Sequence, residues 1–283
     1  MADYLLHSMG EFSEIFKAAF EAKKPMKLTE IGSEYGGSTK IIANYAKNNS
    51  AYAYIVDPSP FADLTEVLAE YNGFYEHRKE KSLDALLNIP ACDFYFIDGD
   101  HNYYTVYNEL KLIHEKNPKA WIFLHDVGWP WAYRDLYYAP ELIPSEGKHE
   151  YTYTDGVGAE NNLIQNGGFR GEGMYAISKK FSGEKNGVLK AIEDFIAPYD
   201  ADLYFSKIAP IFGLGLITPV EDQAIAQKIL APYQIKLMDR MERNRLELYL
   251  KVIELQGEIQ NTFSKLPYRI MRKMLSIFDS KNK

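Results

Sequence analysis

Two short apolar runs that end abruptly in acidic and imidazole side chains constrain this chain most. Residues 94–97 have the length and composition of a buried parallel strand, and Asp98, Asp100 and His101 follow them directly. Ligands of open α/β sheets bind at the carboxyl ends of the strands, so we expect these three side chains to lie where chemistry is done. An ordinary strand followed by a polar turn is the alternative.

The second apolar run, residues 120–124, ends in His125 and Asp126 and favours the functional interpretation. Carboxylate oxygens from Asp98 and Asp126 suit Mg²⁺ or Mn²⁺. A cation there could bind a substrate diol and lower the pKa of the hydroxyl that reacts. The role of His125 stays open between a third metal ligand, a partner of a ligand and a structural histidine. His101, with an ordinary pKa of about 6.5, is a workable base near neutral pH.

A glycine-rich turn, residues 33–38, follows the first predicted strand and leads into a helix over residues 39–47. This arrangement is typical of cofactor-binding elements in Rossmann-like folds. Glycine lets the backbone approach a ligand, and the start of the helix offers free N–H groups. Asp57 ends the second predicted strand, residues 51–56, where an acid can accept both hydroxyls of a ribose. A turn or capping residue is the alternative for Asp57.

The other segments complete an alternation of strands and helices. Further strands are expected at 74–77, 203–208 and 212–218, and helices at 3–20, 61–71, 82–87, 105–116 and 185–197. This order predicts an α/β fold, a Rossmann-like, doubly wound and mostly parallel sheet of about seven strands with an antiparallel hairpin at its end.

Two regions depart from this alternation. Residues 127–172 are irregular and rich in aromatic side chains, which could cover the sheet or stack on sugar rings; we predict a substrate-recognition insertion. We expect one domain over residues 1–220, followed by a helical extension over residues 221–283. Apolar side chains between residues 238 and 259 favour either a coiled coil, and so a homo-oligomer, or a helix packed on the domain's own flank. The basic, amphipathic tail, residues 264–283, could contact an anionic membrane surface or a partner protein; a solvated tail is the alternative.

Composition narrows the class of protein. The chain has 283 residues, 46% hydrophobic and 25% charged, as in soluble globular proteins. Its net charge of −7 argues against a nucleic-acid partner. The single cysteine, Cys92, cannot form an internal disulfide and fits a reducing compartment. No signal peptide or membrane span is apparent. We predict a cytoplasmic protein, which the basic tail could place at the inner face of the membrane.

A family resemblance draws these motifs together. Residues 30–38, Asp57, residues 96–101 and residues 124–126 resemble, in order and spacing, the class I S-adenosylmethionine-dependent methyltransferases. More narrowly, they resemble the metal-dependent sugar O-methyltransferases of macrolide and polysaccharide biosynthesis. The similarity spans roughly residues 26–127, and it implies that residues 1–220 form a class I methyltransferase domain.

The resemblance implies a role for each matching residue. Asp98 and Asp126 match metal-binding carboxylates for Mg²⁺ or Mn²⁺, and His101 matches the proposed base. His125 stands where some relatives carry an acid, and we keep it as a candidate metal ligand. The candidates for binding S-adenosyl-L-methionine are Glu30, Gly32, Ser33, Gly36, Gly37, Ser38, Asp57, Ser82 and Asp98. The implied reaction is methylation of a sugar hydroxyl in a surface polysaccharide or a glycosylated metabolite.

Two other functions compete with this one. An NAD-dependent sugar oxidoreductase would share the sheet and the acid after the second strand, but the turn here reads G-x-x-x-G-G rather than G-x-G-x-x-G. A non-catalytic cofactor-binding assembly subunit would act through its C-terminal helix. The acids and histidines at the strand ends argue against that second alternative.

Overall fold

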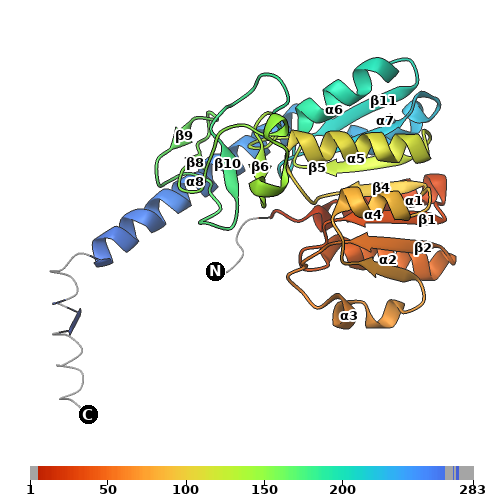
Figure 1. The fold of residues 1–283 in the computed structure, drawn as a ribbon, viewed down its shortest axis with the longest axis horizontal. Coiled ribbons are helices and arrows are strands. Elements are labelled where there is room, and N and C mark those ends of the chain that lie inside the picture. Colours follow the sequence, from red (N-terminus) through yellow and green to blue (C-terminus); the bar gives the residue numbers. More distant parts are fainter. Residues whose placement is uncertain (1–5, 265–269, 271, 274–283) are drawn as a thin grey trace, which may run out of the picture.

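A seven-stranded sheet forms the centre of the computed structural model, which describes residues 6–264, 270 and 272–273 (Figure 1). Its strand order is β11-β12-β5-β4-β1-β2-β3, and only β12 runs against its neighbours. The strands are β1 (Lys27–Ile31), β2 (Tyr52–Val56), β3 (Tyr75–Arg78), β4 (Phe94–Ile97), β5 (Trp121–His125), β11 (Leu203–Ile208) and β12 (Leu214–Pro219). The predicted fold class, with its terminal antiparallel hairpin, is confirmed.

Helices cover both faces of the sheet because successive strand residues point to opposite sides. On one face, Leu28 and Phe96 join the core with α1, α2 and α7. On the other, Ile31 and Ile97 join the core with α4, α5 and α6. The helices are α1 (Ser13–Lys23), α2 (Gly37–Asn49), α3 (Leu64–Val67), α4 (Ser82–Asn88), α5 (Tyr103–Lys116), α6 (Val188–Ile196), α7 (Gln223–Leu230) and α8 (Lys236–Ser264).

Three of the expected helices are shorter than predicted. The helix expected over 185–197 is α6, which starts only at Val188 because Gly187 before it has a φ of +96°. In place of a helix over 3–20, a 3₁₀ turn over Met9–Phe12 precedes α1, because the Ser8 side chain caps the turn at the Gly10 N–H. Residues 1–5 lie outside the described part of the chain. In place of a helix over 61–71, α3 is a single turn followed by a 3₁₀ turn over Ala69–Tyr71.

The region between β5 and α6 folds into two small sheets. β6 (Leu136–Tyr137), β10 (Ala176–Ser178) and β7 (Tyr151–Thr152) form one, and β8 (Gly156–Val157) with β9 (Leu163–Ile164) forms the other. Single 3₁₀ turns lie at Pro140–Leu142 and Ser145–Gly147. In Figure 1 these elements lie beside the carboxyl end of the central sheet, next to α8.

Helix α8 packs on the domain at its start and then extends away from it (Figure 1). Leu246 is buried against Phe212. Further along, Leu248, Val252, Leu255 and Ile259 are between 45% and 60% exposed, so this part of the apolar seam is not packed on the domain. Most of the basic tail lies outside the described residues. Among the helices that the structure describes, none is long and apolar enough to cross a membrane.

Candidate active site

The carboxyl ends of β4 and β5 bring the two predicted acidic clusters together. These strands are parallel neighbours with Ile97 opposite Leu124, so Asp98 and Asp126 leave the sheet at the same edge. The Asp98 N–H donates to the Ile31 carbonyl at 2.8 Å, which fixes the end of β4 against β1. Asp126 has a φ of +59°, a left-handed conformation that aims its side chain back over the edge.

His101 and Asp126 form a buried pair in which the histidine Nδ1 lies 2.7 Å from Asp126 Oδ2. Burial by itself lowers the pKa of His101, but the Asp126 carboxylate raises it above its usual value. Burial raises the pKa of Asp126, and the imidazoles of His101 and His125 lower it below its ordinary value. Because Nδ1 faces the carboxylate, the proton of a neutral His101 lies on Nδ1, and the Nε2 lone pair is left to accept a proton.

His125 lies between two hydrogen-bond acceptors. Its Nδ1 is 2.9 Å from Asp98 Oδ1, and its Nε2 is 2.8 Å from the Ile211 carbonyl oxygen. Both nitrogens must therefore donate, which makes the ring a cation. Burial lowers the pKa of His125, yet Asp98 and Asp126 raise it to about 10. Such a ring has no lone pair for a metal. Of the alternatives for His125, this geometry favours a partner that orients Asp98.

Asp100 turns away from the His101 ring. Its Oδ2 accepts a hydrogen bond from the Thr105 hydroxyl at 3.1 Å, at the start of α5. Burial raises its pKa. The carboxylate that contacts the His101 imidazole is that of Asp126 and not that of the nearby Asp100.

The donor set fits a divalent cation. Asp98, His101 and Asp126 each offer one ligand atom, and these atoms lie within 4.8 Å of one another. Within the described residues, the Asp98 Oδ2 and Asp126 Oδ1 atoms have no hydrogen-bond donor, so each carboxylate keeps one oxygen for a metal. Two carboxylates outweigh the single His125 cation, which leaves net negative charge for a hard ion such as Mg²⁺ or Mn²⁺.

The glycine turn after β1 is held by close backbone approach to β4. A Cβ on Gly32 would lie 2.2 Å from the Asp98 carbonyl oxygen, and its φ is +85°. Only glycine fits both constraints. Gly36, with a φ of +82°, is the N-cap of α2, and Gly37 is the first residue of that helix. The start of the glycine turn and the end of β4 at Asp98 are therefore in direct contact.

Asp57 ties this turn to the end of β2. Its Oδ2 accepts from the Ser33 N–H at 2.9 Å and from the Ser33 hydroxyl at 2.8 Å. Its Oδ1 accepts from the Ser59 N–H at 2.9 Å. The turn alternative for Asp57 is thus present in the structure, on the same side chain that the sequence assigns to ribose.

The remaining cofactor candidates lie around α2 and α4. Glu30 is fully buried beside the hydroxyls of Ser38 and Thr39, and burial raises its pKa to about 8. It is therefore protonated at neutral pH. Ser82 is the first helical residue of α4, after Lys81, and lies near the carboxyl of Glu109.

An N-terminal segment, residues 6–12, lies on the glycine turn. A Cβ on Gly10 would come within 3.1 Å of the backbone at Gly37, so the two segments touch. His7 Nε2 is 3.2 Å from Glu34 Oε1, in the turn itself. The glycine turn is therefore covered by the residues before α1.

Two tyrosines between β5 and α6, Tyr138 and Tyr175, lie beside the site, and the sequence did not single them out. The Tyr138 ring lies 6.1 Å from the His101 ring and 6.0 Å from that of Tyr175. Tyr138 is 50% exposed. Its pKa is raised, mainly because neighbouring atoms shield the hydroxyl from water and secondly because the Asp126 and Asp98 carboxylates are near. Tyr138 thus lies near the acids and keeps part of its surface exposed. The aromatic excess of residues 121–153 was the only signal in the sequence, and it does not say which rings reach the site.

Comparison with known proteins finds a match to the part of the chain that forms this edge of the sheet. Residues 29–127 match the family model described as a methyltransferase domain. The match starts in β1 and ends immediately after Asp126, so it holds the glycine turn, Asp57 and both acidic strand ends. No curated protein sequence matches the chain.

Several solved structures are similar to this chain. An O-methyltransferase from Bacillus cereus in complex with SAH has 16% identity and a TM-score of 0.45, over 77% of this chain and 84% of that chain. An SAH-bound methyltransferase from Podospora anserina has 16% identity and a TM-score of 0.46, over 76% and 80%. TomG from Streptomyces achromogenes, an O-methyltransferase of tomaymycin synthesis in complex with SAM, has 12% identity and a TM-score of 0.46, over 76% and 82%. Similarity at this level carries no argument about substrate or metal.

Proposed function

We propose that this protein is an S-adenosylmethionine-dependent O-methyltransferase that methylates a sugar hydroxyl, in a surface polysaccharide or a glycosylated metabolite. The observation that carries the proposal is the His101–Asp126 pair, with a Nδ1–Oδ2 distance of 2.7 Å, beside Asp98 at the sheet edge that also holds the glycine turn. The methyltransferase-domain match over residues 29–127 supports it.

The chain's own residues supply positioning and a base. S-adenosylmethionine brings an electrophilic methyl group on a sulfonium, so the protein mainly needs to align an oxygen with it. His101 Nε2 accepts the proton of the acceptor hydroxyl as the O–CH₃ bond forms and the S–CH₃ bond breaks. Asp126 keeps the proton of neutral His101 on Nδ1 and stabilises the imidazolium that results.

A divalent cation fits the same proposal. Asp98 and Asp126 would hold Mg²⁺ or Mn²⁺ through their unengaged oxygens, and the metal would lower the pKa of a sugar hydroxyl. His125 would keep Asp98 oriented toward the cation. If His101 instead gave its Nε2 to the metal, it could not act as the base, so the proposal assigns the metal to the two carboxylates.

We further propose the division of the chain into residues 1–220, with the insertion at 127–172, and a helical extension over 221–283. The exposed apolar side chains of α8 support a homo-oligomer or partner contact through that helix. Contact of the tail with a membrane surface and a cytoplasmic location remain predictions from the sequence.

The test replaces the proposed base. In His101→Ala, methyl transfer from tritiated S-adenosylmethionine to an acceptor glycan should fall by about 10²–10⁴-fold, the usual contribution of a positioned base. Binding of S-adenosylhomocysteine, measured by thermal shift, should stay within about twofold of the wild type.

His149→Ala is the matched control, because His149 hydrogen-bonds the Lys185 carbonyl and makes no hydrogen bond or ion pair with Asp98, His101 or Asp126. Unchanged transfer in His101→Ala would remove His101 as the base. A thermal shift with NAD but none with S-adenosylhomocysteine would replace the methyltransferase by the oxidoreductase alternative.

A further inference from the structure

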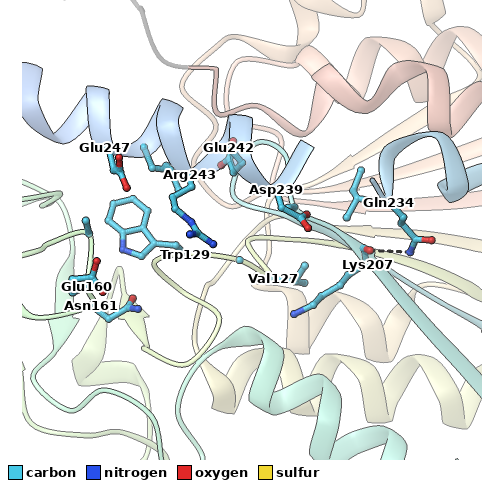
Figure 2. Close-up of a pocket in the computed structure, with 15 residues that line it drawn as sticks. Val127, Trp129, Glu160, Asn161, Lys207, Gln234, Asp239, Glu242, Arg243 and Glu247 are labelled. Carbon is cyan, nitrogen blue, oxygen red and sulfur yellow. Dashed lines mark hydrogen bonds between the residues drawn. The ribbon is translucent and has the colours of Figure 1, made fainter. Parts of the chain in front are cut away.

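A large pocket opens beside the candidate active site. It has a volume of about 810 Å³ and begins at Val127, the residue after Asp126. Its other walls come from the end of β11, from residues 159–161 of the insertion and from the first turns of α8 (Figure 2). β11 runs parallel to β5, because both pair antiparallel with β12, so the pocket lies at the same sheet edge as Asp98 and Asp126. A pocket of this size accommodates a ligand larger than one sugar ring.

Trp129 gives the pocket a fixed aromatic wall. Its Nε1 donates to the Gly158 carbonyl at 3.0 Å. The rings of Phe169 and Phe212 pack against it at centroid distances of 5.6 and 6.2 Å. The indole stays partly exposed and lies at the left in Figure 2, between Glu247 and Glu160. A pyranose presents C–H bonds on one ring face, and these suit the electron-rich face of an aromatic ring.

Polar side chains without partners surround the indole. Five charged groups of the lining make no ion pair or side-chain hydrogen bond with any described residue: Lys207, Arg243, Glu160, Asp239 and Glu247. Donors and acceptors thus lie within one pocket, as recognition of hydroxyl groups requires, since each hydroxyl both donates and accepts.

The sign of the charge limits the ligand further. The lining holds two basic side chains, Lys207 and Arg243, against four acidic ones, Glu160, Asp239, Glu242 and Glu247. Glu242 is neutralised by Arg245, at 2.7 Å, and the remaining acids still outnumber the bases. A diphosphate would meet net repulsion here, whereas an uncharged saccharide would not.

An uninterrupted series of rings connects the pocket with His101. Successive centroids from His101 through the insertion to Trp129 are 5.6 to 6.1 Å apart. The rings follow the order His101, Tyr138, Tyr175, Trp131, Phe169 and Trp129. The segment between β5 and α6 therefore holds a packed series of rings that runs from the proposed base to the pocket wall and passes through the buried Trp131.

We propose that this pocket binds the saccharide units next to the one that is methylated, so that the acceptor is a phosphate-free oligosaccharide or polysaccharide rather than a nucleotide-activated sugar. The inference rests on the proposed function, because the methylated unit is the one at His101. Trp129 stacks on a neighbouring ring, while Arg243 and Glu247 bind its hydroxyls.

The first experiment measures binding without chemistry. Full-length protein is applied to an array of uncharged oligosaccharides of one to six units, with UDP-glucose as the nucleotide-sugar probe in solution. We expect binding to oligosaccharides of two or more units and at least a tenfold loss in the double variant Arg243→Ala/Glu247→Ala. Arg240→Ala is the matched control, because Arg240 is an exposed residue of the same helix outside the pocket lining. Trp129→Phe, which keeps a ring but loses the indole N–H, should weaken binding less than the double variant.

The second experiment uses the best array ligand as a methyl acceptor. The double variant should raise KM for the oligosaccharide at least tenfold, with kcat and the KM of the corresponding methyl monosaccharide unchanged. Absence of array binding, equal binding by the double variant, or preference for UDP-glucose would each overturn the pocket assignment. Array binding that depends on the pocket but comes without methyl transfer would support the pocket and refute the proposed function instead.

Discussion

The buried carboxyl of Glu30 should make the stability of this protein fall as the pH rises. Burial raises the pKa of Glu30 from 4.5 to about 8 in the folded protein. The unfolded chain therefore releases this proton near pH 4.5, whereas the folded protein keeps it until about pH 8. Between these values the unfolded state binds fewer protons, so the free energy of unfolding decreases with pH, and above about pH 8 no further loss occurs.

The magnitude follows from the same two values. At about 1.4 kcal/mol per pH unit, the interval from 4.5 to about 8 corresponds to a loss of up to about 5 kcal/mol. Domains are typically stable by about 5–15 kcal/mol, so one such group is a large fraction of the total. Glu30→Gln keeps the shape of the protonated side chain and cannot ionise.

Urea denaturation at pH 5, 6, 7 and 8, at constant ionic strength, tests this reasoning. Wild type and Glu30→Gln should unfold with nearly equal free energies at pH 5, and the variant should be more stable by several kcal/mol at pH 8. Glu21→Gln, on the exposed surface of α1, is the control and should show no such divergence. A constant difference between Glu30→Gln and wild type across the whole range would refute the burial argument.

Two further predictions concern the glycine turn and the metal. Gly32→Ala should destabilise the protein by more than about 3 kcal/mol in urea titrations, because the new Cβ would clash with the Asp98 carbonyl at a positive φ. Gly73→Ala, which has a similar φ of +88° but open space around the Cβ, should cost only about 1 kcal/mol; similar losses in both variants would mean that the clash is relieved by a small shift. Chelation with EDTA should lower methyl transfer at least tenfold, and Mn²⁺ or Mg²⁺ should restore it in the wild type but not in Asp98→Asn. A rate that EDTA leaves unchanged would remove the metal from the proposed function.

Several strands of this protein are readable from its sequence, because β2, β4 and β5 are short apolar runs that end at Asp57, Asp98 and His125-Asp126. The arrival of Asp98 and Asp126 at one edge was predictable for the same reason, since parallel neighbours end together. The start of the first helix was not predictable from apolar spacing, because a local hydrogen bond from the Gly10 N–H to the Ser8 hydroxyl decides it.

Which histidine pairs with which acid could not be read from the sequence. His101 pairs with Asp126 and His125 pairs with Asp98, so each pair crosses between the two strand ends. The crossing depends on the left-handed backbone of Asp126 and on the Ile211 carbonyl, which comes from the loop before β12. Contacts between segments so far apart leave no periodic signal in the chain. The same holds for Tyr138, which reaches the site through the folding of the insertion.

One hydrogen bond joins α8 to the segment over the glycine turn, residues 6–12. Arg245 Nη1 donates to the Leu6 carbonyl at 3.0 Å, across a sequence separation of 239 residues. A contact of such high order closes a very long loop, so we expect it to form only after the central sheet has assembled. By the same reasoning, its opening requires only local unfolding of the segment over the glycine turn and leaves the core intact. Opening of the Arg245–Leu6 hydrogen bond, and not of the sheet, would then limit how fast a cofactor at the glycine turn exchanges. Amide hydrogen exchange at residues 6–12 would report the rate of this opening.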